Sequence, residues 1–373
     1  MNNKKLWRSV PLALAVAFSN SAMAGISLYD QDGTTFSVDG YFNAFYTYQD
    51  SEDKVADTNT KTSRVRMGFL PNYIGFNVGK KVGDLTVGGR SSFWVSINDS
   101  NQVSTNANKT DSMIDVRQFY ATVDGDFGQV LFGKDFGLYG RSNIFGDELL
   151  MGVGFAPATT SNTTFGNITT GYPYANPTAQ ITYRSPVMSG FQVAVGVLDP
   201  NTTGSTAAGD TNSARFETEA TYSADYDGVA VKAWIGGAIG DSVTSGVDAK
   251  GISYGAKIAA AGFALTASGF DQEGISSVFA SNTLTDSAES DGYLVQGSYA
   301  FSTNRVVLSY GQTENTAAGS SVTTKDSLTG AALFHNINDN LTLVAEYTVH
   351  KTDNGSIDTA ATDTVALGAV LSW

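Results

Sequence analysis

Cysteine is absent from the 373-residue chain, and histidine occurs only twice, as His335 and His350. Without cysteine, disulfide frameworks, iron–sulfur clusters, cysteine-based zinc sites and thiol catalysis are excluded. Neither histidine lies in a recognisable nucleophile motif, so we expect no catalytic residue, no metal site and no cofactor. Basic residues are also scarce, with 22 Lys and Arg against 36 Asp and Glu and a formal net charge of −14. Because phosphate binding needs a basic surface, we expect no nucleic-acid partner.

Long hydrophobic runs are missing as well. Residues 11–18 are apolar but too few to cross a bilayer as a helix, which takes about 20 residues. Basic residues precede this run, and Ala22 and Ala24 supply small side chains before a cleavage site. That order predicts a cleaved secretory signal peptide over residues 1–24, which leaves residues 25–373 as the mature domain.

Alternation of apolar and polar residues runs through most of the remaining chain. In segment 363–373 every second residue from Val365 to Trp373 is apolar, and segment 341–351 has the same pattern. A period of two indicates a β-strand with one apolar and one polar face. The sequence predicts sixteen such strands, near 34–49, 63–79, 85–98, 113–123, 129–134, 179–185, 191–198, 214–224, 229–239, 250–259, 263–271, 291–301, 305–313, 326–335, 341–351 and 363–373.

The connections between these segments alternate between short and long. Links rich in glycine and aspartate, such as 80–84 and 124–128, alternate with longer polar stretches, such as 99–112. An up-and-down barrel whose turns lie at two different surfaces produces this alternation. The apolar parity switches within segment 63–79, so we expect a bulge or bend at 70–72.

The two faces of the strands indicate which solvent each one meets. Sixteen strands enclose a lumen too wide for side chains to fill, and the polar face carries charged and hydroxyl side chains that need water. The apolar face must then lie outside, against lipid. Tyr46, Tyr48, Tyr347 and Trp373 lie near strand ends, as in the aromatic girdles of membrane barrels. The sequence therefore predicts an all-β, transmembrane, antiparallel up-and-down barrel of sixteen strands.

Connection 135–178 is longer than any other in the chain. Irregular stretches of that length inside a compact domain usually have a function. Leu138 and Phe145 could anchor it to a wall, while Asp147 and Glu148 would project. Two interpretations remain open at this point. The segment either folds into the lumen and narrows it, or forms an extracellular flap whose carboxylates are solvated.

Several short runs resemble a known family. Residues 117–134 resemble the strand–turn–strand that precedes the third loop in trimeric general porins of Gram-negative bacteria, and residues 63–66, 73–76 and 182–191 resemble further segments of that family. The resemblance implies a sixteen-stranded homotrimeric channel in the outer membrane, surrounded by lipid and lipopolysaccharide. It also implies that the third loop folds inside the lumen.

In that family, basic side chains on the barrel wall face acidic side chains on the third loop. Such opposed charges would order water and bias which ions pass. The alternation of segment 85–98 places Arg90 on its polar face. The resemblance adds the other members of a basic wall, opposite Asp147 and Glu148, so that the wall comprises Arg64, Arg66, Arg90, Arg117, Lys134 and Arg184. The family's Pro-Glu-Phe-Gly-Gly loop tip is absent, and Trp373 stands where phenylalanine is usual as the C-terminal assembly signal.

These features together favour a porin, a water-filled channel for passive diffusion of small hydrophilic solutes and ions. One alternative is a solute-specific porin, for instance for oligosaccharides, but Trp94, Trp234 and Tyr120 are too few for the aromatic ladder that such a channel needs. A second alternative is a barrel that acts mainly as an adhesin or phage receptor through long acidic loops such as 272–290. An outer-membrane enzyme has the least support.

Overall fold

The strands follow the predicted order along the chain. The computed structural model describes residues 25–98, 114–157, 164–200, 214–241, 248–275, 284–317, 319–355 and 357–373, and the predicted signal peptide lies outside these ranges. Helix α1 (Arg141–Phe145) is short, and no helix in the described ranges is long and apolar enough to cross a membrane. The strands are β1 (Ile26–Gln31), β2 (Thr34–Asp53), β3 (Thr58–Arg66), β4 (Asn72–Val82), β5 (Leu85–Val95), β6 (Asp115–Gly125), β7 (Gly128–Phe136), β8 (Pro177–Arg184), β9 (Phe191–Leu198), β10 (Arg215–Tyr226), β11 (Val229–Asp241), β12 (Asp248–Ala260), β13 (Phe263–Ile275), β14 (Leu284–Phe301), β15 (Asn304–Thr316), β16 (Thr323–Asn336), β17 (Leu341–Asp353) and β18 (Asp358–Ser372).

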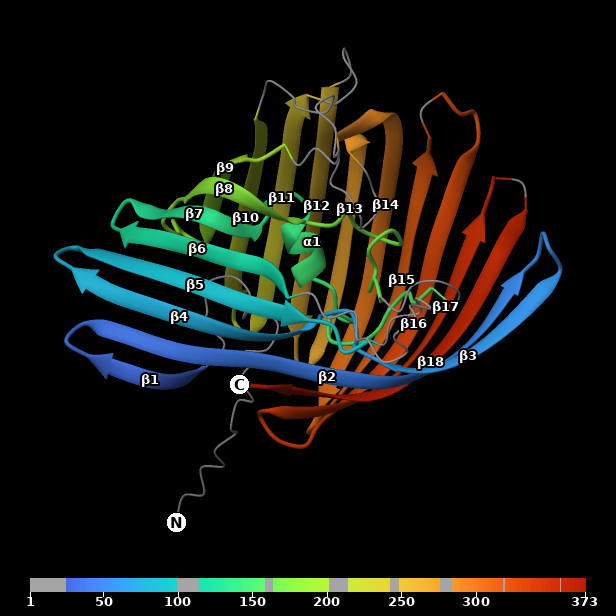
Figure 1. Ribbon diagram of the computed structural model, residues 1–373, viewed down its shortest axis with the longest axis horizontal. Coiled ribbons are helices and arrows are strands. Elements are labelled where there is room, and N and C mark those ends of the chain that lie inside the picture. The colour runs from blue at the N-terminus through green and yellow to red at the C-terminus, as the bar shows by residue number, and fades with distance from the viewer. Residues whose placement is uncertain are drawn as a thin grey trace, which may run out of the picture.

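These strands occupy sixteen positions in one closed antiparallel sheet (Figure 1). β1 and β18 pair with successive parts of one edge of β2, and β3 and β4 pair with successive parts of its other edge. Pairing of β9 with β10 and of β18 with β2 completes the ring. The predicted sixteen-stranded antiparallel barrel is confirmed.

The second predicted strand is divided into β3 and β4 by three inserted residues. Phe45 pairs with Arg66 and Tyr41 pairs with Tyr73, so a step of four residues on β2 faces a step of seven on the other strand. Because side chains alternate with a period of two, an odd insertion exchanges the two faces. The expected bend at 70–72 is therefore present, and it explains the switch of apolar parity in the sequence.

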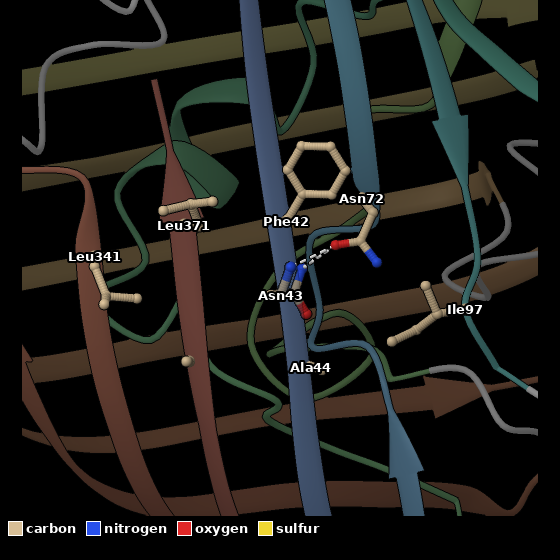
Figure 2. Close-up of a pocket in the computed structure, with 8 residues that line it drawn as sticks. Phe42, Asn43, Ala44, Asn72, Ile97, Leu341 and Leu371 are labelled. Atoms are coloured by element: carbon tan, nitrogen blue, oxygen red, sulfur yellow. Dashed lines mark hydrogen bonds between the residues drawn. The ribbon is translucent and has the colours of Figure 1, made fainter.

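Side-chain amides satisfy the backbone groups that this break exposes. Asn43 Oδ1 accepts a hydrogen bond from Gly68 N (2.5 Å), and Asn43 Nδ2 donates to Leu70 O (2.8 Å). The Asn43 N–H donates to Asn72 Oδ1 (2.5 Å). In hydrocarbon, unpaired peptide groups would be strongly destabilising. Beside this network a mostly apolar cavity of about 280 Å³ hollows the wall (Figure 2), lined by Phe42, Asn43, Ala44, Asn72, Ile97, Leu341, Ala369 and Leu371.

The two faces of the barrel differ as the sequence predicts. On β18, Val365 and Leu367 are 41% and 54% exposed, whereas Thr364 and Ala366 are 3% and 1% exposed. The same alternation of exposed apolar and buried side chains appears on β15 and β17. The outer face is thus an apolar surface, and the inner face carries most of the polar and charged groups of the strands.

The C-terminal residue extends the pairing of β18 with β2 by one further contact. The backbones of Trp373 and Gly40 exchange two hydrogen bonds, of 3.0 and 3.1 Å. The Trp373 ring stacks on Phe42 at 5.2 Å and covers Gly40 so closely that a Cβ there would lie 2.4 Å from a ring carbon. Only glycine leaves room for the indole at this position.

Candidate functional site

Segment 137–176, which connects β7 to β8, is fastened to inner-face side chains at its start. Glu217 on β10 accepts hydrogen bonds from the backbone N–H groups of Leu138 (2.6 Å) and Tyr139 (2.9 Å). Trp234 on β11 donates its indole N–H to Asn143 Oδ1 in helix α1 (2.8 Å). The first turn of the segment is therefore positioned by β10 and β11, which lie outside the β7–β8 pair that the segment connects.

A second carboxylate fastens the middle of the segment. Glu346 on β17 accepts hydrogen bonds from the N–H groups of Val153 (2.9 Å) and Gly154 (2.6 Å). The carbonyl of Gly152 accepts a hydrogen bond from Phe69 N (2.8 Å), within the break between β3 and β4. A Cβ on Gly152 would lie 1.8 Å from the Glu346 carboxylate, so glycine is required for this close approach.

Glu148 lies at the centre of an ion cluster. Its carboxylate binds Lys257 on β12 and Arg305 on β15, and Arg305 Nη1 lies 2.8 Å from Glu148 Oε2 and 3.0 Å from the Glu148 carbonyl oxygen. The Glu148 N–H donates to Gln296 on β14 (2.7 Å). Burial acts to raise the pKa of Glu148, but the two cations outweigh it and hold this pKa below its ordinary value.

Asp147 is buried among neutral groups. It accepts hydrogen bonds from Tyr172 OH (2.6 Å), Asn167 Nδ2 (2.9 Å) and Gln296 Nε2 (2.6 Å). Within the described part of the chain, no cation lies within ion-pair distance of its carboxylate. Burial, only partly offset by these hydrogen bonds, raises the pKa of Asp147. Asp147 therefore ties the outgoing and returning halves of the segment to each other and to β14.

Three of the predicted wall arginines are paired with other acids. Arg90 on β5 forms a two-pronged ion pair with Asp39 on β2, at 2.7 and 3.0 Å. Arg184 on β8 lies 3.9 Å from Glu219 on β10. Arg117 on β6 lies 2.7 Å from Asp115 and donates to Tyr174 OH in segment 137–176 (3.3 Å). None of these arginines is among the ion-pair partners found for Asp147 and Glu148 in the described residues.

The other predicted wall residues divide between the two faces. Arg64 and Arg66 on β3 pair with inner-face residues of β2, and Arg66 donates to Thr47 Oγ1 (3.0 Å). Lys134 on β7 pairs directly with Phe119 of β6 and shares its face with Phe132, and these two rings are 58% and 48% exposed. The structure therefore places Lys134 on the outer face, away from the other basic residues.

Four basic residues of this region were missed from the sequence. Lys257 and Arg305 bind Glu148, and Arg141 in α1 lies 3.1 Å from Asp135 on β7. Lys232 on β11 lies on the inner face, directly opposite Lys257. Alternation within the strands could have placed the two lysines on the polar face, because both share the parity of inner-face neighbours. Nothing in the periodicity shows which of them meets segment 137–176.

The fold and the faces of its strands define a class of protein. A closed sixteen-stranded antiparallel sheet with an apolar outer face and a polar inner face is an outer-membrane β-barrel channel. The chain belongs to the Gram-negative porin family, whose model matches residues 12–355.

Individual relatives agree with this assignment. Outer membrane protein U of Vibrio parahaemolyticus serotype O3:K6 is 30% identical over 141 residues, and the match covers 36% of this chain and 37% of that relative. Among solved structures, the outer-membrane channel DcaP of Acinetobacter baumannii superposes with a TM-score of 0.66 at 15% identity, over 94% of this chain and 100% of that one. An anion-selective porin from Comamonas acidovorans gives 0.64 at 15% identity, over 91% and 100% of the two chains. OmpF of Salmonella typhi, in complex with daunomycin, gives 0.56 at 16% identity, over 93% and 100%. At these identities the structural likenesses establish the fold.

Proposed function

We propose that this outer-membrane protein is a passive, water-filled channel for small hydrophilic solutes and ions. In this proposal segment 137–176 lies across the lumen and sets the size of the opening. The observation that carries the proposal is the set of strands that hold the segment. Its contacts reach β10 and β11 at its start, β12, β14 and β15 at Glu148, and β17 at Glu346, a large part of the ring.

The chemistry of these contacts favours a fixed restriction over a moving gate. Glu217 and Glu346 each accept two backbone N–H groups, and Glu148 pairs with two cations. Hydrogen bonds to charged groups contribute about 1.5–3 kcal/mol each. The ion pairs of Glu148 and the backbone hydrogen bonds at Glu217 and Glu346 together keep the segment docked. A docked segment that leaves part of a wide lumen open suits diffusion without energy coupling.

We also propose that the channel is a homotrimer. Lys134 lies on the outer face of β7 between exposed aromatic rings. A lysine on the lipid-facing surface of a barrel is unfavourable, so this face is better accommodated against further copies of the chain than against lipid. Native mass spectrometry of the detergent-extracted protein should give the mass of three chains, and a purely monomeric species would contradict the trimer.

The channel can be tested with single cysteines, because the chain contains none of its own. Thr221 lies on the inner face of β10 opposite Trp234, and the adjacent Ala220 points to the outer face. We expect Thr221→Cys to form ohmic channels in a planar bilayer and to lose conductance when a charged, membrane-impermeant thiol reagent is added. Ala220→Cys is the matched control and should keep its conductance. Absence of current steps from the unlabelled protein would refute the channel.

A further inference from the structure

A hollow in the barrel wall faces the surrounding membrane. It is the cavity of about 280 Å³ beside the break between β3 and β4. Phe42 pairs directly with Leu371, and these side chains are 37% and 41% exposed on the outer face. The next outer-face pair is Ala44 with Ala369. Because two methyl groups follow a ring and a branched chain, the outer surface is recessed at this point (Figure 2).

The hollow suits a hydrocarbon chain. Apart from two asparagines, its lining consists of Phe42, Ala44, Ile97, Leu341, Ala369 and Leu371, so it carries no charge. An apolar cavity of about 150 Å³ is enough to bind benzene, and this larger space has room for a run of several methylene groups. The walls of an empty space lose dispersion contacts, which a chain from the bilayer would supply.

One polar group distinguishes the hollow from a simple recess in an apolar surface. Asn72 is 2% exposed, and its Oδ1 accepts the Asn43 N–H at 2.5 Å, which fixes the orientation of the amide. The Asn72 nitrogen therefore points away from Asn43 (Figure 2). Within the described residues, no acceptor lies at hydrogen-bond distance from this nitrogen. An unpaired donor is unfavourable in hydrocarbon, so the hollow lacks one acceptor.

The neighbouring residues place the hollow near the edge of the hydrocarbon layer. The Trp373 ring stacks on Phe42 at 5.2 Å, and Leu341 is the first residue of β17. Tryptophan at the end of a membrane strand is typical of the interface between headgroups and hydrocarbon. The ester carbonyls of phospholipids lie at this interface, where their acyl chains begin.

We propose that the hollow binds one acyl chain of a membrane phospholipid and that Asn72 donates a hydrogen bond to the ester carbonyl of that chain. A phospholipid carries both required groups in one molecule, a neutral carbonyl acceptor and an unbranched chain attached directly to it. Lipid also surrounds this face of the barrel. The apolar lining holds the chain, and the amide selects an ester. This inference is independent of the proposed channel function.

Two lipids that differ only in the carbonyl test the role of Asn72 without altering the protein. The mature protein is exchanged into a mild detergent with equal amounts of two phosphatidylcholines of the same chain length, one with ester-linked and one with ether-linked chains. Native mass spectrometry separates their adducts by mass. We expect the wild type to retain the ester lipid several-fold more than the ether lipid. Equal retention of the two lipids would overturn the proposal.

A matched pair of variants tests the hollow itself. Ala44→Leu should fill the hollow and abolish the preference for the ester lipid, while the hydrogen bond from Asn43 to Asn72 remains. Ala267 is an exposed alanine on the outer face of β13, so Ala267→Leu adds the same bulk elsewhere and should keep the preference. A shift in gel mobility on heating confirms that each variant has formed its barrel.

Two further results would contradict the lipid site. An Ala44→Leu variant with an unchanged preference for the ester lipid would show that the lipid binds elsewhere. Dissociation of an oligomer by Ala44→Leu, without any lipid preference in the wild type, would show that another copy of the chain occupies the hollow.

Discussion

Replacement of Glu148 by glutamine should loosen segment 137–176 without altering the barrel. The substitution keeps the size of the side chain but removes the charge that holds Lys257 and Arg305. Each of these hydrogen-bonded ion pairs contributes about 1.5–3 kcal/mol. Because the two basic side chains remain 18% and 28% exposed, screening lowers the sum to about 2–3 kcal/mol. At 1.4 kcal/mol per factor of ten, the undocked fraction of the segment then rises roughly 30- to 140-fold.

The pH dependence of the wild type gives an independent test of the same contact. The pKa of Glu148 lies below its ordinary value of 4.5 in the folded protein. Its stabilising contribution is therefore fully present above pH 4.5 and is lost as the pH falls through the lower, folded pKa. The raised pKa of Asp147 acts with the opposite sign, because ionisation of that carboxyl weakens docking as the pH rises from 3.8 through the folded pKa. We expect the wild type to approach the behaviour of Glu148→Gln under acid conditions.

Single-channel recording measures both effects. At pH 7 the Glu148→Gln channel should show excess open-channel current noise and brief closures, while its barrel should melt within a few degrees of the wild type. Below pH 4.5 the wild type should become noisier, and the variant should change much less. Glu52 is an exposed acid at the end of β2. Glu52→Gln therefore removes the same charge and should show no excess open-channel current noise. Equal noise in wild type, variant and control would refute the docking argument.

Three further predictions concern other parts of the chain. Gly40→Ala brings a methyl group to 2.4 Å from the Trp373 ring and should lower stability by about 1–3 kcal/mol, seen as a lower temperature for loss of gel mobility; Gly297→Ala, which has nothing within 4 Å of its added carbon, should match the wild type. Glu346→Gln leaves an N–H of the segment unpaired, costing about 1–3 kcal/mol, and should speed proteolytic cleavage within residues 137–176 while the strands stay intact. Mass spectrometry of the protein from outer membranes should find Gly25 as the first residue, and retention of residues 1–24 would contradict the predicted signal peptide.

Much of the barrel could be predicted because the alternation of apolar and polar residues in each membrane strand is a local sequence pattern. A period of two separates the faces, so the strand number, the antiparallel order and the inner position of Arg90 follow from the sequence. The divided strand was visible for the same reason, since an odd insertion at 70–72 exchanges the faces. The first short strand, β1, was not expected, because it extends an edge of β2 and adds no position to the ring.

The ion cluster around Glu148 could not be predicted in the same way. Its partners lie 109 and 157 residues further along the chain, on β12 and β15. Alternation shows which face a side chain occupies, but it gives neither its height along the barrel nor what it meets across the lumen. For Lys134 the alternation was informative, but the family resemblance gave the wrong face. Its parity matches that of Phe132 and indicates the outer face, but the family resemblance placed it on the inner wall.

The pairing of β18 with β2, which the Trp373–Gly40 hydrogen bonds extend, means that the sheet cannot close until its last strand is available. A polypeptide that stops short would insert with part of β2 and β17 lacking a neighbour, and those peptide groups would find no water inside the bilayer. Truncated products that lack β18 are therefore unable to complete the wall.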